Sequence, residues 1–272
     1  MTSIKTARTY LFVPASRPER FAKAHASGAD VVILDLEDAV ADGDKDRARE
    51  ALFDYLAAGG RGMVRVNGTR TSWFKDDAHL CRMDGVQGVI LPKTEQGADI
   101  QWIRQHLRPD TPVLPLIETA AGMINVREIA GTHGVARLVF GTVDFRKELG
   151  IEGDDQELLF FRSMLVLASK AAGIDAPVDG VTLSISDTAE LRRASEQGRR
   201  LGFGGKLCIH PSQVPEVNAA YQPSDALLNW ARRVLEAAQS RPGAFQLDGA
   251  MVDAPVIAHA TALLRQAAQS QP

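Results

Sequence analysis

The sequence predicts an α/β protein folded as a closed TIM (β/α)8 barrel with a C-terminal helical extension. Short runs of β-branched and large apolar residues alternate about eight times with amphipathic or Ala-rich segments. This alternation favours parallel strands joined by right-handed helical crossovers, and such a count within 272 residues favours a closed barrel. An open doubly wound sheet is the alternative, but its usual G-x-G-x-x-G does not follow the first apolar run.

The expected elements follow one another in order along the chain. A short apolar run bounded by turn residues indicates a buried strand, and apolar residues with helical spacing indicate a helix. Eight runs are expected to be strands: residues 9–14, 31–36, 62–66, 88–91, 112–117, 137–140, 178–185 and 204–209. Five segments between them are expected to be helices: residues 18–27, 45–58, 97–107, 156–172 and 188–201.

The character of the sequence changes after residue 211. Strand signals vanish there, and two Ala/Leu-rich stretches flank a connector that contains Gly and Pro. We therefore expect a barrel domain over residues 1–222 and a helical extension over residues 223–272. The expected helices of the extension are residues 224–239 and 255–269, and its connector is residues 241–254.

Composition limits the class of protein. Hydrophobic residues make up 45% of the chain and charged residues 24%, which is typical of a globular enzyme. No apolar run approaches the ~20 residues of a membrane span, and no signal peptide is evident, so we expect a cytoplasmic protein. A net charge of −3 offers no basic field for nucleic acid. Cys81 and Cys208 stand outside any Cys/His cluster, which indicates buried thiols rather than a disulfide or a zinc site.

Acidic residues interrupt the strand pattern where chemistry is expected. Barrel enzymes build their sites at the C-terminal ends of strands, and Glu118 and Asp144 lie at the ends of the fifth and sixth expected strands. Hard oxygen ligands without a nearby His or Cys suit Mg²⁺ completed by water and substrate oxygens. Two solvated loop acids would give the same pattern.

Further charges end the second and third strands. Glu37 and Asp38 follow Asp35, and we expect them to hydrogen-bond the waters of a metal ion, with a helix cap or a salt bridge as the alternative. Arg65 lies within the third strand pattern, where its guanidinium suits a bidentate grip on a substrate carboxylate or a structural ion pair.

A basic cluster follows the first strand. Arg17, Arg20 and Lys23 lie at the start of an expected helix, where positive charge is unfavourable for the helix itself. The cluster therefore indicates an anionic ligand such as phosphate, although a solvated basic face would look the same.

Several motifs together resemble one known family. The motifs are RTYLFVPASRPERF, VILDLEDAV, RVNG, GVILPKTE, PLIETAAGMINVREIA, LVFGTVDF, GKLCIHPSQV and GAFQLDGAMVDAPVI. With these motifs the chain resembles the HpcH/HpaI aldolase and citrate lyase β-subunit family, and in particular its CitE-like members, from about Arg8 to His259. This resemblance implies a TIM barrel that cleaves or forms a carbon–carbon bond in a CoA thioester such as malyl-, citramalyl- or citryl-CoA, with Mg²⁺ as cofactor and a 2-oxo acid as product.

The resemblance also implies roles for particular residues. By position in the family's motifs, Glu118 and Asp144 are metal ligands and Arg65 holds the substrate carboxylate. The region of Arg17 and Lys23 meets CoA in the family. Asp253 of MVDAP matches an acid that reaches into a neighbouring subunit's site as general acid/base. The extension is therefore expected to pack on a neighbouring subunit, in a homotrimer or a hexamer made of two trimers.

One motif departs from the family's pattern. Residues 142–145 read TVDF where many citrate lyase β subunits carry a GDL-type sequence, so neither citrate nor an acyl-carrier-protein partner is implied.

Three other functions are alternatives to the lyase. A class II aldolase acting on free 2-oxo acids typically uses a His base, for which His210 is the nearest candidate and is expected to be structural. The second alternative is thioester hydrolysis or malate-synthase-like chemistry. The third is a binding barrel without turnover.

Overall fold

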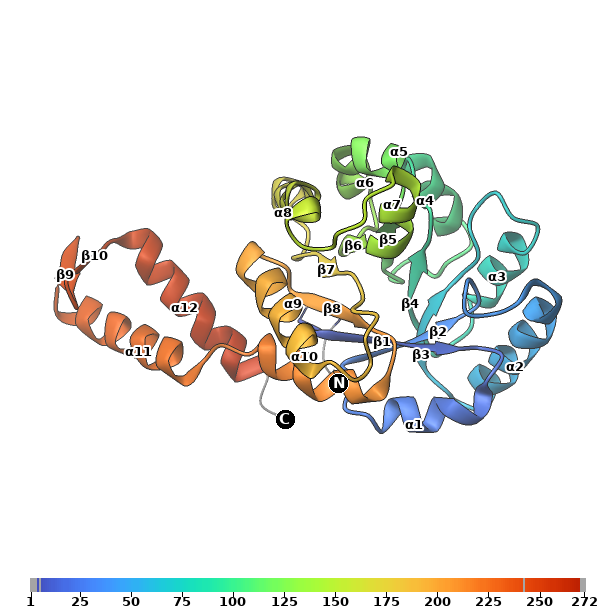
Figure 1. The fold of residues 1–272 in the computed structure, drawn as a ribbon, viewed down its shortest axis with the longest axis horizontal. Helices are drawn as coiled ribbons and strands as arrows, with labels where there is room; N and C mark the ends of the chain where they lie inside the picture. Colours follow the sequence, from blue (N-terminus) through green and yellow to red (C-terminus); the bar gives the residue numbers. More distant parts are fainter. Residues whose placement is uncertain (1–3, 5, 242, 270–272) are drawn as a thin grey trace.

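Eight parallel strands close into a barrel in chain order, as the sequence predicts (Figure 1). The computed structural model describes residues 4, 6–241 and 243–269. The first strand pairs with both the second and the eighth, which closes the barrel. The strands are β1 (Thr9–Pro14), β2 (Val31–Asp35), β3 (Gly62–Arg65), β4 (Val86–Leu91), β5 (Val113–Ile117), β6 (Val139–Phe140), β7 (Val178–Asp179) and β8 (Gly205–Cys208).

Helices surround the barrel and connect its strands (Figure 1). The helices are α1 (Phe21–His25), α2 (Lys45–Ala57), α3 (Phe74–Leu80), α4 (Gly97–Arg104), α5 (Ala120–Ile124), α6 (Val126–Gly131), α7 (Thr142–Leu149), α8 (Leu159–Ala172), α9 (Thr188–Leu201) and α10 (Val214–Ala220), with 3-10 turns at Pro18–Arg20, Asp42–Asp44, Gln156–Leu158 and Pro211–Gln213. Side-chain caps stabilise the N-terminal ends of some helices. At the start of α9, the Asp187 carboxylate accepts a hydrogen bond from the Glu190 N–H.

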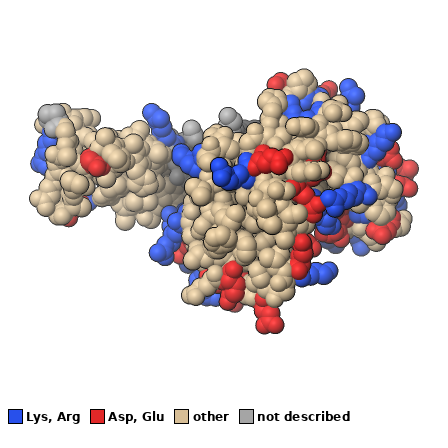
Figure 2. Space-filling view, turned by 90° about the horizontal axis from the view of Figure 1, so that it is seen from above, with Lys and Arg blue, Asp and Glu red and all other residues tan. Residues whose placement is uncertain are grey.

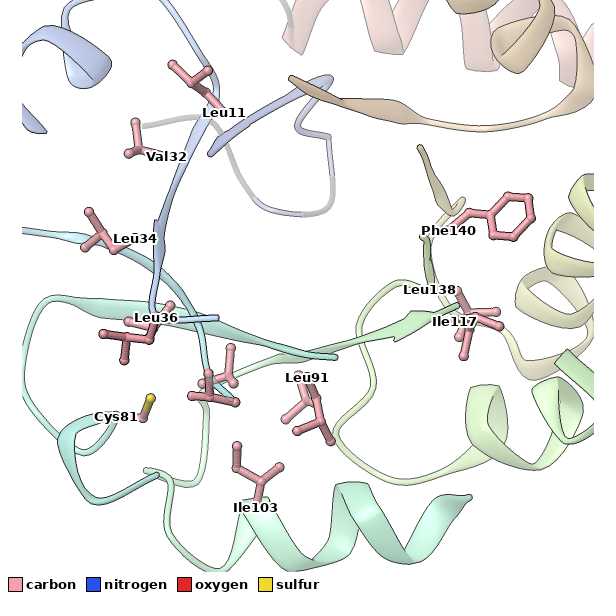
Figure 3. Packing of buried hydrophobic residues seen from close by; sticks show 14 of the residues in the cluster. Leu11, Val32, Leu34, Leu36, Cys81, Leu91, Ile103, Ile117, Leu138 and Phe140 are labelled. Atoms are coloured by element: carbon pink, nitrogen blue, oxygen red, sulfur yellow. The ribbon is translucent and has the colours of Figure 1, made fainter. Parts of the chain in front are cut away.

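The core has two layers because successive strand side chains point to opposite sides. One layer faces the helices, and Figure 3 shows it, with Val32, Leu34 and Leu91 among its members. The other fills the barrel interior and includes Ile33 and Met63. Asp35 and Arg65 come two residues after these two interior residues. The same alternation therefore directs both charged side chains inward, at the end of the barrel where active sites form.

A buried arginine closes the opposite end of the barrel. Arg137 is 1% exposed, and its guanidinium donates to the carbonyl oxygens of Ala176 (2.6 Å), Ala7 (2.7 Å) and Ile4 (3.1 Å) and to the Tyr10 hydroxyl (2.9 Å). These bonds join the N-terminal segment to the loop before β7. Burying the cation is tolerable because neutral acceptors satisfy its N–H groups.

The C-terminal extension is a projecting arm (Figure 1). It consists of α11 (Asp225–Ser240), β9 (Phe245–Leu247), β10 (Ala250–Val252) and α12 (Ala254–Gln269). The two helices pack through a small core of their own. Figure 2 shows the arm standing out from the barrel, with few charged side chains on the face in view.

Three expectations for local structure are wrong. The connector contains a β-hairpin, since Asp248 (φ 52°) and Gly249 (φ 81°) form the Asp-Gly turn that joins β9 to β10. The seventh strand ends at Asp179 rather than residue 185, and Leu183 and Ile185 are exposed beyond it. The expected helix over residues 18–27 is a 3-10 turn followed by the five-residue α1.

Other differences concern short elements. The sequence did not predict five helices: α3, α5, α6, α7 and α10. All five have eight residues or fewer, so the spacing of their apolar residues is a weak signal. The predicted domain bounds at residues 1–3 and 270–272 lie outside the described residues. None of the helices in the described ranges combines the length and the apolar character required to cross a bilayer.

Candidate active site at the barrel mouth

A cavity of about 330 Å³ opens at the C-terminal ends of the strands. Its lining divides into charged groups, among them Asp35, Arg65 and Asp144, and apolar groups such as Phe12 and Leu207. Three larger hollows, of about 570, about 760 and about 510 Å³, lie at the opposite end of the barrel, between α2 and α3, and beside α9. None of the three gathers buried charges from several strand ends, so the mouth is the candidate site.

Arg65 is held in a fixed orientation at the end of β3. Its Nε and Nη2 donate to the two carboxylate oxygens of Asp35, at 2.7 and 2.6 Å, and its Nη1 lies 2.9 Å from Oε2 of Glu37. The guanidinium also stacks on the ring of Phe12, 4.6 Å from its centre. Burial opposes the charge of Arg65, but Asp35 and Glu37 outweigh that effect and raise its pKa. The structural ion pair is therefore present, and it leaves an oriented cation at the cavity wall.

Glu37 is buried between two cations. It is 4% exposed, and besides Arg65 it receives a 2.9 Å hydrogen bond at Oε1 from Nζ of Lys93. Burial raises the pKa of Glu37, and the charge of Arg65 opposes that rise. Asp38 differs: its side chain is 53% exposed, lines the cavity and lies 3.9 Å from Lys93 Nζ. Asp38 caps no helix, because α2 begins seven residues later at Lys45.

A buried lysine fixes the backbone that carries Glu37. Nζ of Lys45 is 2.8 Å from the carbonyl oxygens of both Leu36 and Glu37, and the residue is 4% exposed. The amide of Asn67 also donates to the Leu36 carbonyl, at 3.1 Å. The loop after β2 is thus anchored by side chains from α2 and from the loop after β3.

Glu118 lies at the end of β5 with its carboxyl almost fully enclosed. It is 2% exposed, and the backbone N–H of Lys93 donates to its Oε1 at 2.8 Å. Burial raises the pKa of Glu118 to about 8, and the charges of Glu37 and Asp144 add to that rise. A Cβ on Gly141 would stand 2.5 Å from both Cβ and Oε2 of Glu118, so the close approach of β6 depends on glycine.

Asp144 faces the same space from the first turn of α7. The sequence placed it at the end of the sixth strand, and the structure places it four residues beyond β6, half-buried and lining the cavity. Its charge acts on Glu118, as the raised pKa of Glu118 records. Within the described ranges, no group of three or more His, Cys, Asp or Glu side chains is arranged to hold a metal. Glu118 and Asp144 are thus linked by the effect of one charge on the other, outside any three-ligand cluster of the described residues.

The remaining predicted site residues lie apart from this cluster. Arg17 and Lys23 are exposed, the first in the turn after β1 and the second on α1. Asp253 lies between β10 and α12 in the arm, where its carboxylate accepts from the Val256 N–H at 3.3 Å. The arm projects away from the barrel that carries it (Figure 1), so Asp253 does not complete the site of its own chain.

His210 has a local structural contact. Its Nδ1 is 2.7 Å from Oγ of Ser212 and accepts from the Ser212 N–H at 3.2 Å, capping the 3-10 turn at Pro211–Gln213. The ring is committed to this turn, as expected from the sequence. The geometry gives no support to a His base of the class II aldolase type.

Residues 8–211 match the sequence profile of the HpcH/HpaI aldolase/citrate lyase family. The chain belongs to that family. It is 41% identical over 268 residues to a citrate lyase subunit beta-like protein of Mycobacterium tuberculosis, covering 96% of each chain. It is 36% identical over 256 residues to a (3S)-malyl-CoA thioesterase of Cereibacter sphaeroides, covering 90% of this chain and 89% of the relative.

A family member of known structure has the same fold. The crystal structure of CitE from M. tuberculosis in complex with magnesium, acetoacetate and coenzyme A superposes with a TM-score of 0.86 and 38% sequence identity. The match covers 97% of this chain and all of that one. The TIM barrel and the family membership predicted from the sequence are therefore confirmed.

Two residues of the site were not predicted from the sequence. Lys93 bonds Glu118 through its backbone and Glu37 through its side chain, and Gly141 gives Glu118 its space. The signal for Lys93 was present, because PKTE ends the fourth strand as IETA ends the fifth. Gly141 follows β6 directly, and only the packing of β5 against β6 shows what the glycine is for.

Proposed function

We propose that this chain is a Mg²⁺-dependent carbon–carbon lyase that cleaves or forms a 3-hydroxyacyl-CoA thioester of the malyl-, citramalyl- or citryl-CoA type. The products of cleavage are an acyl-CoA and a 2-oxo acid. The observation that carries the proposal is the pair Glu118 and Asp144 beside the fixed guanidinium of Arg65, in a chain similar along its length to a CitE solved with magnesium and coenzyme A.

The donor set fits magnesium. Mg²⁺ is commonly held by one or two carboxylates, with water and substrate oxygens completing the coordination. Glu118 and Asp144 repel each other and Glu118 is buried, so a cation between them would stabilise the ionised form of both. Magnesium bound there would supply positive charge beside the oxygen on which negative charge develops.

The remaining side chains bind the substrate and transfer protons. Arg65, oriented by Asp35 and Phe12, grips the substrate carboxylate. Asp38, which lines the cavity, accepts the hydroxyl proton, and the bond between the hydroxyl-bearing carbon and the thioester α-carbon breaks. The 2-oxo acid leaves, and the thioester enolate takes a proton from Asp253 of a second subunit. Glu37 would hydrogen-bond water held by a bound ion.

Two exposed cations follow β1 along the chain. Arg17 lies three residues after the end of β1, and Lys23 lies on α1; we assign both to the phosphates of CoA. Exchange of either for Met should raise KM for the thioester with little change in kcat, since phosphates far from the reacting carbon contribute uniform binding. A fall in kcat at constant KM would contradict this assignment.

The proposal is tested by offering the purified protein malyl-, citramalyl- and citryl-CoA with Mg²⁺ and following 2-oxo acid release. Activity should need both the thioester and the metal, and Glu118→Gln should abolish metal-dependent turnover. Cleavage of free 2-oxo-3-deoxy acids without CoA, or full activity of Glu118→Gln, would overturn the proposal.

The role of Asp253 requires a second subunit, and subunit mixing tests it. Glu118→Gln and Asp253→Asn should each be inactive alone. After the two proteins are mixed and allowed to exchange subunits, some sites would combine an intact Glu118 with an intact Asp253, and activity should return. A mixture that stays inactive although mixed assemblies form would refute sharing of the site. The expected assembly is a homotrimer or a pair of trimers.

Thioester hydrolysis is the second candidate function. It is favoured by the 36% identity to a (3S)-malyl-CoA thioesterase along most of both chains. Release of free thiol together with malate from malyl-CoA indicates hydrolysis, whereas acetyl-CoA together with glyoxylate indicates the lyase. Product analysis by mass spectrometry separates the two directly.

A further inference from the structure

Lys93 has an unusual backbone conformation at the barrel mouth. It follows β4 by two residues and has a φ of 50°, in the left-handed region that non-glycine residues seldom adopt. Such a conformation costs free energy and persists where surrounding contacts fix it. The contacts of Lys93 should therefore explain why the conformation is kept.

Those contacts join two acids from different strands. The backbone N–H of Lys93 bonds Glu118 at 2.8 Å, and its Nζ bonds Glu37 at 2.9 Å. Both carboxylates thus lie within reach of a single residue. The charge of Glu37 also contributes to the raised pKa of Glu118. Among the described residues these acids are not arranged as a three-carboxylate site, so Glu37 would have to leave Lys93 in order to join a cation at Glu118 and Asp144.

Two cations hold Glu37 away from that role. One carboxylate oxygen of Glu37 is bonded by Lys93, and the other lies 2.9 Å from Nη1 of Arg65. Arg65 cannot follow Glu37 if it turns, because Asp35 fixes the guanidinium through two hydrogen bonds. Lys93 is the adjustable partner, since its side chain is 50% exposed.

We propose that Lys93 is a positioning residue that, together with Arg65, keeps the Glu37 carboxylate out of the inner coordination of the catalytic cation, so that positions on the ion stay open for substrate oxygens. A metal that acts on a substrate needs open positions, and a third carboxylate would fill one. This inference rests on the proposed role of Glu118 as a magnesium ligand.

The test measures metal affinity separately from turnover. Lys93→Met keeps the backbone N–H and removes Nζ, and Lys93→Gln is a second variant in case the first folds poorly. Each is titrated with MgCl₂ and with CaCl₂ in a calorimeter, and kcat/KM is measured on the best thioester. Lys170→Met, on the exposed side of α8, is the matched control.

The expected changes run in opposite directions. With Glu37 free to turn toward the ion, the Kd for Mg²⁺ should fall about tenfold, and the Kd for Ca²⁺ should fall further because Ca²⁺ takes more oxygen ligands. At the same time kcat/KM should fall about 10- to 100-fold. Lys93→Arg should retain activity, and Lys93→Met with Glu37→Gln should lose the tighter binding.

Four results would overturn the proposal: weaker Mg²⁺ binding by both Lys93 variants, unchanged affinity and turnover, equal tightening of Mg²⁺ and Ca²⁺, or tighter binding that survives Glu37→Gln. Failure of the underlying function looks different. If Glu118→Gln binds Mg²⁺ as the unaltered protein does, the magnesium assignment itself is wrong. If Glu118→Gln loses Mg²⁺ while the Lys93 variants behave as the control does, only the role of Lys93 is refuted.

Discussion

Replacing Gly141 by alanine tests whether the position of Glu118 controls the site. Gly141 follows β6, and its N–H donates to the Ile117 carbonyl at 2.9 Å. Its φ of −87° is one that any residue adopts, so alanine carries no backbone penalty there. The effect of Gly141→Ala is therefore purely steric, and it falls on Glu118.

The size of the effect follows from the distances. The new Cβ would stand 2.5 Å from both Cβ and Oε2 of Glu118, whereas carbon atoms in contact prefer about 3.5–4.0 Å. Glu118 or the turn into α7 must move by about 1 Å. Rotating the Glu118 side chain does not move its Cβ, so the backbone has to shift. A displacement of about 1 Å at a reacting site costs about 100-fold in rate, and overpacking of this kind costs about 1–3 kcal/mol of stability.

Three measurements check this prediction: Mg²⁺ affinity by calorimetry, kcat/KM on the best thioester, and the free energy of unfolding in urea. Gly131→Ala is the control, because a Cβ at the end of α6 meets nothing within 4 Å. The control should match the unaltered protein within about 1 kcal/mol. Gly141→Ala with unchanged metal affinity and turnover would refute the reasoning that Glu118 is held in place by the close packing of β5 on β6.

Three further predictions concern buried charges. Arg137→Met should lower the free energy of unfolding in urea by about 2–6 kcal/mol, because it leaves two buried acceptors, the Ala7 carbonyl and the Tyr10 hydroxyl, without their donor, while metal affinity stays unchanged. Lys45→Met should cost about 2–4 kcal/mol and also reduce kcat, since it releases the carbonyls of Leu36 and Glu37. Without metal, the raised pKa of Glu118 favours folding at low pH, so stability should fall between pH 4.5 and about 8, by up to about 5 kcal/mol.

Each of these three predictions has an outcome that would contradict it. An unchanged urea midpoint for Arg137→Met would show that the closed end of the barrel does not depend on the arginine. For Lys45, a stability loss without a loss of kcat would remove any link to Glu37. The pH effect should shrink in Glu118→Gln and in saturating Mg²⁺; a pH dependence that is the same in Glu118→Gln must arise from another group.

The barrel could be predicted because its signal is repeated. Eight apolar runs separated by helical segments agree with one another, so an error in any one of them leaves the architecture unchanged. The errors fell on elements with little local signal, namely the two-residue β7 and the short helices α3, α5, α6, α7 and α10. The hairpin in the arm was a different kind of error, since Asp248 and Gly249 formed a recognisable turn sequence within a segment assumed to lack strands.

The site was predictable in part for the same reason. Parallel strands in a barrel end at one face, so acids at strand ends must gather there, and the structure brings Glu37 and Asp144 close enough to Glu118 to raise its pKa. Their partners were harder to assign. Whether Arg65 pairs with Asp35, and which backbone N–H reaches Glu118, depend on strand register and loop conformation, neither of which composition or spacing specifies.

The sequence by itself determined the alternation of strands and helices, the family, and the set of acids carried at the strand ends, because these are properties of residue type and order. Only the tertiary structure decided that Glu37 is enclosed between Arg65 and Lys93, that Gly141 makes room for Glu118, and that the arm carries Asp253 away from its own barrel. Contacts of this kind join residues tens of positions apart along the chain. Their geometry is fixed by how β2, β3 and β5 pack around one barrel axis, and no local pattern records it.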